Sequence, residues 1–125
     1  MMYFIFGLYL SPLFSSIAMV ESGNGFFSEN VYQITSIYVD DLNRIYPEMR
    51  FKKKDVLNKE TSRLMMYLYW KHYAYQYAKE TGRAITYEVL SKMHHCGGRY
   101  WTRDDTGTVS KCEKYWSKIN KMLLK

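Results

Sequence analysis

The chain has 125 residues, of which 47% are hydrophobic and 18% aromatic, and it carries a formal net charge of +6. A chain of this length forms one domain, and its apolar content excludes an intrinsically disordered protein, which lacks the apolar surface needed to fold. The positive charge indicates an anionic partner, which can be nucleic acid, a membrane surface or an acidic cell-wall polymer.

The first twenty residues carry no charged side chain and resemble a membrane span or the core of a signal peptide. A basic n-region is missing, however, and Ser11-Pro12 is a typical helix start, with Ser as the N-cap and Pro at the first helical position. We therefore predict a helix over 11–22, preceded over 1–10 by an apolar leader or a buried first segment. Residues 11–125 would form the domain.

A cleaved signal peptide remains an alternative for this segment. Ser16 and Ala18 have the small side chains of a cleavage site. Cleavage there would leave Glu21 almost at the new terminus.

Hydrophobic spacing and helix-breaking residues predict the remaining elements. We expect helices over 31–45, from about 55 or 58 to 81, from 86 to about 94 and over 111–124. They end at Pro47, Gly82 and Cys96-Gly97-Gly98, while Gly23-Asn24-Gly25 ends the first helix and 26–30 form a loop. No strand-like alternation stands out, so the predicted fold is all-α or nearly so.

The predicted helix that ends at Thr81 has the longest apolar stripe. Its apolar positions at 3-4 spacing are Leu64, Leu68 and Tyr75, with Met65, Tyr69 and His72 beside them. This pattern is typical of a central buried helix and not of a cofactor site.

Two cysteines, Cys96 and Cys112, are too few for a disulfide-built fold and lack the spacing of a zinc site. One disulfide between them and two buried free thiols are both compatible with the sequence. The three histidines, His72, His94 and His95, form no metal-ligand pattern, and we predict neither a metal nor a cofactor.

The candidate catalytic residue is Glu21, which follows Ile17 by four residues and Leu13 by eight, and so lies on or beside the apolar face of its helix. Partial burial favours the protonated form of a carboxyl group, which is the form that a general acid needs. The alternative is an exposed Glu at a frayed helix end.

Four short motifs occur in order along most of the chain. They are Ile-Ala-Met-Val-Glu-Ser-Gly at 17–23, Val-Tyr-Gln-Ile-Thr at 31–35, Met-His-His-Cys-Gly-Gly at 93–98 and Tyr-Trp-Ser-Lys-Ile at 115–119. Together they resemble the catalytic-Glu segment and the later motifs of soluble lytic transglycosylases and goose-type lysozymes. The chain departs from that family at Asn30, where Gly is usual, at Cys96, where Asn is common, and in the short loop from Ser22 to Tyr32.

The resemblance implies a small lysozyme-like domain around a central buried helix that cleaves the MurNAc-GlcNAc β-1,4 bond of peptidoglycan. Glu21 would act first as acid and then as base, so that 1,6-anhydromuropeptides form. The same resemblance implies substrate contacts by Ser22, Tyr32, Gln33, Ile34, His95, Gly97, Tyr100 and Trp101. His94 can take the place of His95, and the alternative for either is a helix-end histidine that bonds a backbone carbonyl. Packing is the alternative role of each aromatic residue.

A hydrolytic lysozyme is the alternative activity, and it needs a second carboxylate. Asp40 and Asp41 are the nearest candidates, with one of them solvent-facing or ion-paired, and Asp104 and Asp105 lie in a later loop. A single catalytic Glu favours the transglycosylase.

Two other functional classes stay open. One is a lysozyme-like wall-binding module without activity, and the other is a basic helical nucleic-acid-binding protein. The Lys and Arg residues are spread over several segments with no recognition-helix pattern, which argues against nucleic acid.

We expect a monomer directed to the cell envelope (periplasmic, secreted or phage-delivered), without stable membrane insertion, in which Lys52-Lys53-Lys54 adds attraction to the anionic wall.

Overall fold

The computed structural model describes residues 2–22 and 29–125, and the predicted Gly23-Asn24-Gly25 stop and most of the 26–30 loop lie outside them. The helices and strands are β1 (Phe4–Ile5), β2 (Leu8–Tyr9), α1 (Ser11–Ser22), α2 (Ser36–Ile45), α3 (Lys59–Thr81), α4 (Tyr87–Cys96) and α5 (Thr106–Leu123). Three 3-10 helices join them, η1 (Pro47–Met49), η2 (Lys53–Leu57) and η3 (Tyr100–Thr102). The prediction of a nearly all-α domain is confirmed.

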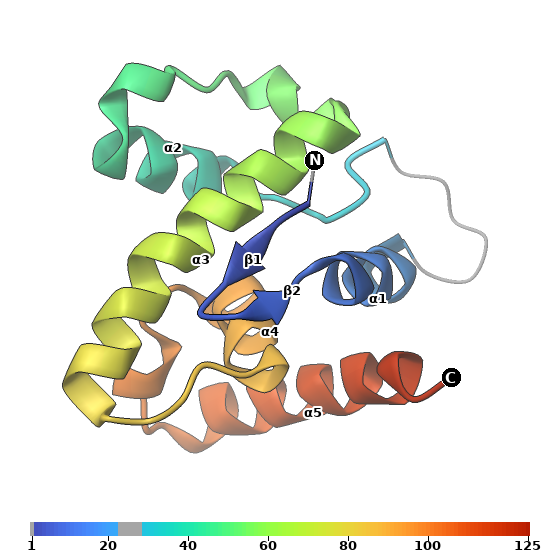
Figure 1. Ribbon diagram of the computed structural model, residues 1–125, viewed down its shortest axis with the longest axis vertical. Helices are drawn as coiled ribbons and strands as arrows, with labels where there is room; N and C mark the ends of the chain where they lie inside the picture. The colour runs from blue at the N-terminus through green and yellow to red at the C-terminus, as the bar shows by residue number, and fades with distance from the viewer. Residues whose placement is uncertain (1, 23–28) are drawn as a thin grey trace.

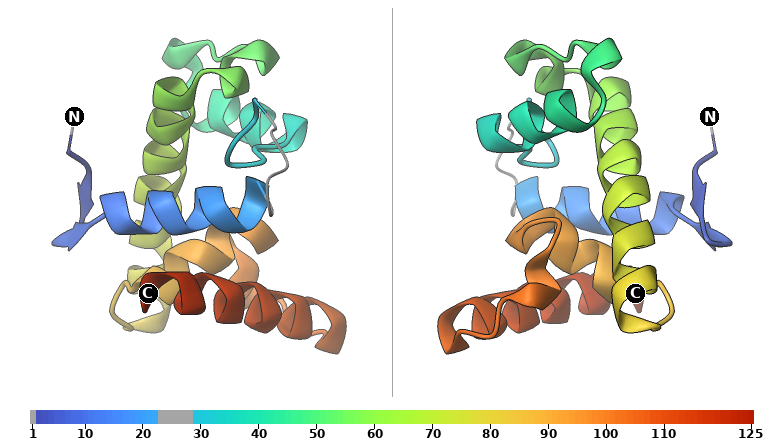
Figure 2. Two further views of the ribbon diagram at one scale, coloured as in Figure 1. Left: turned by 90° about the vertical axis from the view of Figure 1, so that its right-hand side faces the viewer. Right: turned by 90° about the vertical axis from the view of Figure 1, so that its left-hand side faces the viewer.

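The long helix α3 runs through the molecule and organises the other helices (Figure 1). It contacts α2 near its N-terminal half and α4 farther along, while α1 and α5 lie side by side and cross its direction (Figure 2). The fully buried Trp70 lies at the middle of α3, and its indole N–H donates to the carbonyl of Leu90 in α4 at 2.8 Å.

The buried face of α3 differs in part from the predicted stripe. The buried side chains are Ser62, Met65, Met66, Tyr69, Trp70, Tyr73, Ala74 and Tyr77. Tyr75, which was expected inside, is 60% exposed, and Leu64 and Leu68 are only partly buried. Apolar residues surround this helix on several faces, so their spacing alone did not single out the face that packs. Its predicted ends are confirmed, with Asn58 as the N-cap and Gly82 in the left-handed conformation at the C-cap.

The first segment folds as an antiparallel hairpin, which the sequence pattern did not predict. Phe4 pairs with Tyr9 and Ile5 with Leu8. Phe6 and Gly7 both have positive φ, at 49° and 82°, as a tight two-residue turn requires. The segment is too short to show alternation, but it buries Ile5 in the core.

Helix α1 has the predicted bounds but a different cap. The Phe14 N–H donates to the Leu10 carbonyl at 2.9 Å, so Leu10, and not Ser11, occupies the position of an N-cap. Leu13, Phe14 and Ile17 are buried beneath the helix.

Helix α2 begins at Ser36, five residues later than predicted. Val31 and Ile34 have helical spacing, but Thr35 caps the helix by accepting from the Tyr38 N–H, and Gln33 has a left-handed φ of 53°. A left-handed residue cannot continue an α-helix, so 31–35 form a turn.

Helix α5 begins at Thr106, five residues earlier than predicted, because Asp105 provides an N-cap before a weakly helical Thr-Gly-Thr-Val segment. Its capping contacts, first those with Thr108, lower the pKa of Asp105 to about 2. The extra turn moves Gly107 and Ser110 from the predicted loop into α5.

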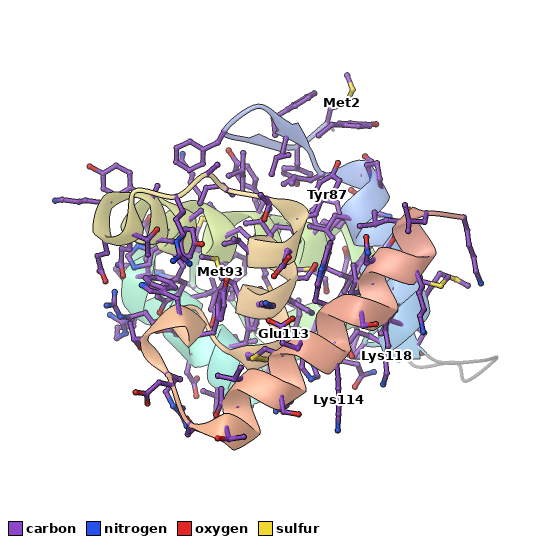
Figure 3. All side chains as sticks on the ribbon, turned by 90° about the horizontal axis from the view of Figure 1, so that it is seen from below. Met2, Tyr87, Met93, Glu113, Lys114 and Lys118 are labelled. Carbon is purple, nitrogen blue, oxygen red and sulfur yellow. A yellow bond between two sulfur atoms is a disulfide. The ribbon has the colours of Figure 1, made fainter. Side chains whose placement is uncertain are left out.

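Two links hold α5 against α4. One is a disulfide between Cys96 and Cys112, which decides between the two states that the sequence left open. The other is the buried Lys92 ammonium, which donates to Glu88 at 2.7 Å and to Glu113 at 2.5 Å. Figure 3 shows this α4–α5 side of the molecule from below.

Among the described residues, no helix is both long enough and apolar enough to cross a membrane.

Candidate functional site

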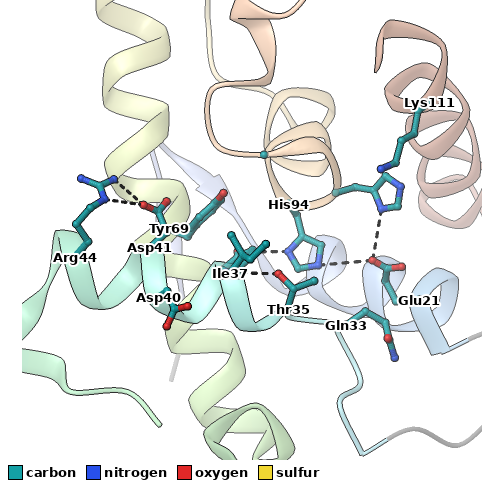
Figure 4. Close-up of a pocket in the computed structure, with 13 residues that line it drawn as sticks. Glu21, Gln33, Thr35, Ile37, Asp40, Asp41, Arg44, Tyr69, His94 and Lys111 are labelled. Atoms are coloured by element: carbon teal, nitrogen blue, oxygen red, sulfur yellow. Dashed lines mark hydrogen bonds and ion pairs between the residues drawn. The ribbon is translucent and has the colours of Figure 1, made fainter. Parts of the chain in front are cut away.

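A cleft of about 830 Å³ opens between the C-terminal end of α1, the turn before α2, α2 itself and the end of α4. It is lined by Glu21, Gln33, Thr35, Ile37, Tyr38, Asp40, Asp41, Arg44, Tyr69, His94, His95, Gly97 and Lys111. Figure 4 shows Glu21 near one end of this cleft and the Asp41–Arg44 pair near the other. The cleft therefore contains four of the residues predicted to bind or cleave substrate, namely Glu21, Gln33, His95 and Gly97.

Glu21 lies in the last turn of α1, and its side chain is 15% exposed. Its Oε2 accepts a hydrogen bond from the Tyr115 hydroxyl at 3.4 Å. The nearest ring nitrogens are Nε2 of His94 at 3.8 Å and Nδ1 of His95 at 3.9 Å. The carboxyl group is therefore held by α4 and α5 and is mostly shielded from water, although it still reaches the cleft.

His95 and Tyr115 form one side of the Glu21 environment. Their rings stack with centroids 4.0 Å apart and planes 3° from parallel. Burial first, and then the charge of Glu21, raises the pKa of Tyr115 well above its ordinary value. The hydroxyl therefore keeps its proton and remains a donor to Glu21.

His94 is buried, and its hydrogen bonds fix its tautomer. Nε2 lies 2.7 Å from the Tyr32 carbonyl, which can only accept, so Nε2 carries a proton. Nδ1 lies 3.4 Å from the Tyr38 hydroxyl, which can donate to it. Burial lowers the pKa of His94, with the Glu21 charge acting in the opposite direction. A neutral His94 thus supports the cleft wall beside Glu21 and brings no positive charge to it.

The two other carboxylates that line the cleft are both paired with cations. Asp41 accepts from Arg44 at 2.6 Å and also from the Tyr73 hydroxyl. Asp40 accepts from the Lys53 ammonium, which also donates to the Ser36 carbonyl at 2.8 Å. Glu21 is therefore the one carboxylate among the described cleft-lining residues that has no Lys or Arg partner.

The turn before α2 presents Gln33 to the cleft. Asn30 holds this turn, because its side chain donates to the Ile34 carbonyl at 2.9 Å and accepts from the Ile34 N–H at 3.0 Å. Gln33 adopts the left-handed conformation there, and its Nε2 donates to the Asn30 carbonyl at 2.9 Å. The departure at Asn30 from the family pattern therefore has a structural role in this chain.

The floor of the cleft is aromatic. Tyr38 of α2 stacks on Tyr69 of α3, with ring centroids 3.9 Å apart. The Tyr69 hydroxyl accepts from the Gly98 N–H at 2.8 Å, and burial raises the pKa of Tyr69 to about 12. Gly98 packs so closely on Tyr73 that a Cβ atom there would overlap the Tyr73 ring. The end of α4 is thereby fixed against α3 beside Gly97.

Other residues predicted as substrate contacts lie outside the cleft lining. Tyr32 is 1% exposed, and its hydroxyl accepts from Arg63 at 3.0 Å. Ile34 is buried, and Ser22 donates to the Val31 carbonyl at 3.2 Å. These three residues shape the turn and support the site from behind because their side chains are used in packing or backbone contacts.

Tyr100 and Trp101 were also predicted as substrate contacts, but both pack on Tyr77, with ring centroids 6.5 and 5.3 Å away. They border a separate small cavity beside Lys92, and neither lines the Glu21 cleft. Asp104 and Asp105 do not line the cleft either, because Asp105 is used as the α5 cap.

Several cleft residues were not predicted from the sequence. Thr35, Ile37, Tyr38, Tyr69, Arg44 and Lys111 line it without having been predicted as site residues. Ile37 carried no sequence signal, because its 80% exposure is seen only in the structure and single exposed apolar side chains are common on protein surfaces.

No group of three or more His, Cys, Asp or Glu side chains within residues 2–22 and 29–125 is placed to hold a metal ion. Comparison of the chain with protein-family models, with curated proteins and with solved structures finds no match. The geometry of the cleft and the sequence motifs are therefore the observations that bear on function.

Proposed function

We propose that this protein cleaves the glycan strands of peptidoglycan as a lytic transglycosylase, with Glu21 as the single catalytic acid and base. The observation that carries the proposal is the placement of Glu21 in the cleft. Its carboxyl group is largely shielded from water and reaches an open cleft, while the other two lining carboxylates are paired with cations.

The chemistry requires one carboxyl group that acts twice. Protonated Glu21 gives its proton to the glycosidic oxygen as the bond from that oxygen to C1 of N-acetylmuramic acid breaks. The sugar then has oxocarbenium character, and the Glu21 carboxylate takes the proton of the C6 hydroxyl as O6 bonds to C1. The products are a free hydroxyl on the leaving sugar and a 1,6-anhydro ring, and Glu21 is protonated again.

The carboxylate pairing favours this reaction over hydrolysis. A hydrolase needs a second carboxylate, either as nucleophile or as the base that activates water. Asp40 and Asp41 are held by Lys53 and by Arg44, and Asp41 lies toward the opposite end of the cleft from Glu21 (Figure 4). The intramolecular C6 hydroxyl makes a second carboxylate unnecessary.

The cleft also offers contacts that suit an N-acetylated sugar. Gln33 supplies an amide beside Glu21, and its carbonyl oxygen can accept from an acetamido N–H while its Nε2 is bonded to Asn30. Ile37 presents an exposed apolar side chain to the same cleft, which suits the C–H face of a sugar ring. We place the substrate glycan between these two residues.

The proposal assigns the protein to the cell envelope, where it meets its substrate. The Cys96–Cys112 disulfide supports this assignment, because disulfides persist mainly in oxidising compartments.

The test is digestion of purified peptidoglycan by the wild type and by Glu21→Gln, with mass spectrometry of the soluble products. We expect anhydromuropeptides from the wild type and a loss of at least about 100-fold in Glu21→Gln, the lower range for general acid-base catalysis. The control is Glu48→Gln, which neutralises an exposed carboxylate in η1 and should retain full activity.

Two outcomes would overturn the proposal. Reducing-end products from the wild type would make the protein a lysozyme and direct attention to Asp40 or Asp41. A folded wild type that binds the wall and releases nothing would make it a binding module.

A further inference from the structure

A second groove, of about 440 Å³, continues from the Glu21 cleft along the surface of α5. Glu21, His95 and Lys111 line both the cleft and this groove, so the two spaces meet at the candidate catalytic residue. The remaining lining residues of the groove are Val20, Gly107, Ser110, Lys114, Tyr115 and Lys118. A ligand that fills both spaces would pass directly beside Glu21.

The groove has a row of three lysines along one face of α5. Lys111, Lys114 and Lys118 are spaced by three and four residues, which places them on the same side of a helix. All three are exposed, and no ion pair joins any of them to a carboxylate within the described part of the chain. Figure 3 shows Lys114 and Lys118 on α5.

The acidic residues near this helix do not neutralise the row. Glu113 is the one acidic residue between Thr106 and Leu123, and it pairs with Lys92 of α4. Glu21 is the sole carboxylate among the described residues that line the groove. The groove is therefore cationic along its length and has a carboxyl group only where it joins the cleft.

We infer that the α5 groove binds the carboxylates of the peptide stem that the muramic acid carries, so that the enzyme prefers peptide-substituted glycan to glycan without charged stems. The inference rests on the proposed function, because it takes the glycan to lie in the Glu21 cleft. The stem is attached to the sugar whose glycosidic bond is cleaved, and it must leave the cleft close to Glu21. The groove starts at that point.

The chemistry of the row fits a flexible, multiply charged substituent. Lysine ammonium groups are point charges on long flexible side chains. They can therefore pair with carboxylates in several positions without requiring one fixed geometry. Gly107 and Ser110 leave the groove open, since a Cβ atom at Gly107 would meet nothing closer than Asp105 Oδ2 at 3.9 Å. Exposed pairs of this type are screened by salt, so binding should weaken as ionic strength rises.

The experiment measures binding and does not depend on cleavage. Lys114→Gln/Lys118→Gln is introduced in the Glu21→Gln background, and co-sedimentation is measured with insoluble peptidoglycan freed of secondary wall polymers. A second sample of the same peptidoglycan has its free carboxylates converted to amides. The control, Lys71→Gln/Lys79→Gln, removes the same charge from two exposed lysines that do not line the groove.

We expect the groove variant to bind intact peptidoglycan roughly 2- to 30-fold more weakly at low salt, the range for two exposed ion pairs. The Lys71/Lys79 control should bind like its parent, and amidation of the wall should remove the difference between groove variant and parent. Equal binding by the groove variant and the control would overturn the inference. So would a groove-variant defect that persists on amidated peptidoglycan, or one seen with DNA and not with the wall.

Binding and digestion can fail separately. If the wild type releases no muropeptides while the lysines still govern binding to intact stems, the proposed cleavage is wrong and the groove assignment stands. If digestion proceeds and the lysines have no effect on binding, the groove assignment is wrong and the cleavage stands.

Discussion

The Tyr115 hydroxyl donates to the Glu21 carboxylate at 3.4 Å, although the two residues are 94 positions apart in the chain. The contact joins the end of α1 to the middle of α5, and the stacking of Tyr115 on His95 adds α4 to the same cluster. Under the proposed function, Tyr115 is a positioning residue that acts through the Glu21 carboxyl group and does not line the main cleft.

Tyr115→Phe removes this donor and keeps the ring that stacks on His95. We expect kcat for muropeptide release to fall by roughly five-fold, which corresponds to about 1 kcal/mol for one long hydrogen bond. KM should stay unchanged, because the hydroxyl bonds the proposed catalytic carboxyl group and does not line the cleft proposed to hold the glycan. Tyr87→Phe is the control, because the Tyr87 hydroxyl donates to the Tyr9 carbonyl and Tyr87 lines neither the cleft nor the α5 groove. A rise in KM with unchanged kcat in Tyr115→Phe would contradict the assignment.

The buried His94 predicts a loss of stability in mild acid. Burial lowers the pKa of His94 below its ordinary value of 6.5, so His94 is protonated at a higher pH in the unfolded chain than in the folded chain. The contribution of neutral His94 to the free energy of unfolding is complete above about pH 6.5, and it is lost as the pH falls toward the lowered pKa of the folded state. We expect the urea midpoint of the wild type to fall between pH 7 and pH 5.

The variant that tests this prediction is His94→Gln, which can still donate to the Tyr32 carbonyl but does not titrate. Its urea midpoint should depend less on pH over the same range. Burial also lowers the pKa of His72, which is partly exposed, so His72→Gln should reduce the slope by a smaller amount. A wild-type slope retained in His94→Gln would show that other groups govern the pH dependence.

Gly98 should tolerate no side chain, because its position is set by close packing on Tyr73. Gly98→Ala places a methyl group where the ring lies, and we expect a loss of about 1–3 kcal/mol in the free energy of unfolding, as for other overpacked sites. Gly107→Ala provides the matched comparison, since a Cβ atom there meets only Asp105 Oδ2, at an ordinary contact distance of 3.9 Å, and should change stability by less than about 1 kcal/mol. Urea titration of both variants measures the difference, and equal stabilities would mean that Tyr73 moves aside at low cost.

The capping and stop residues predicted much of the secondary structure from the sequence alone. Asn58, Thr86 and Gly82 define helix ends through bonds to residues within four positions, so local sequence is sufficient to find them. Where a helix start was predicted wrongly, a nearby capping residue had been overlooked. Thr35 and Asp105 are also capping residues, and recognising them would have placed the starts of α2 and α5 correctly.

The residues of the candidate site could be predicted only in part from the sequence. Glu21, Gln33, His95 and Gly97 belong to short motifs, and the fold brings all four to one cleft. Tyr32 belongs to the same motif as Gln33, yet its side chain is buried in the core, whereas Gln33 has a left-handed backbone and lines the cleft. A motif orders residues along the chain, whereas the backbone conformation decides which side chains face the cleft.

The sequence by itself determined the helical class, most helix ends and the charge of the chain, because these depend on local bonds and composition. Only the tertiary structure decided which face of α3 is buried, that Asp40 is paired with Lys53 and Asp41 with the Tyr73 hydroxyl, and that Lys111, Lys114 and Lys118 lie beside Glu21. These relationships join residues from different helices. The helices find their relative positions through the packing of Trp70, Tyr38 and Tyr69 in the core, and no spacing along one helix contains that information.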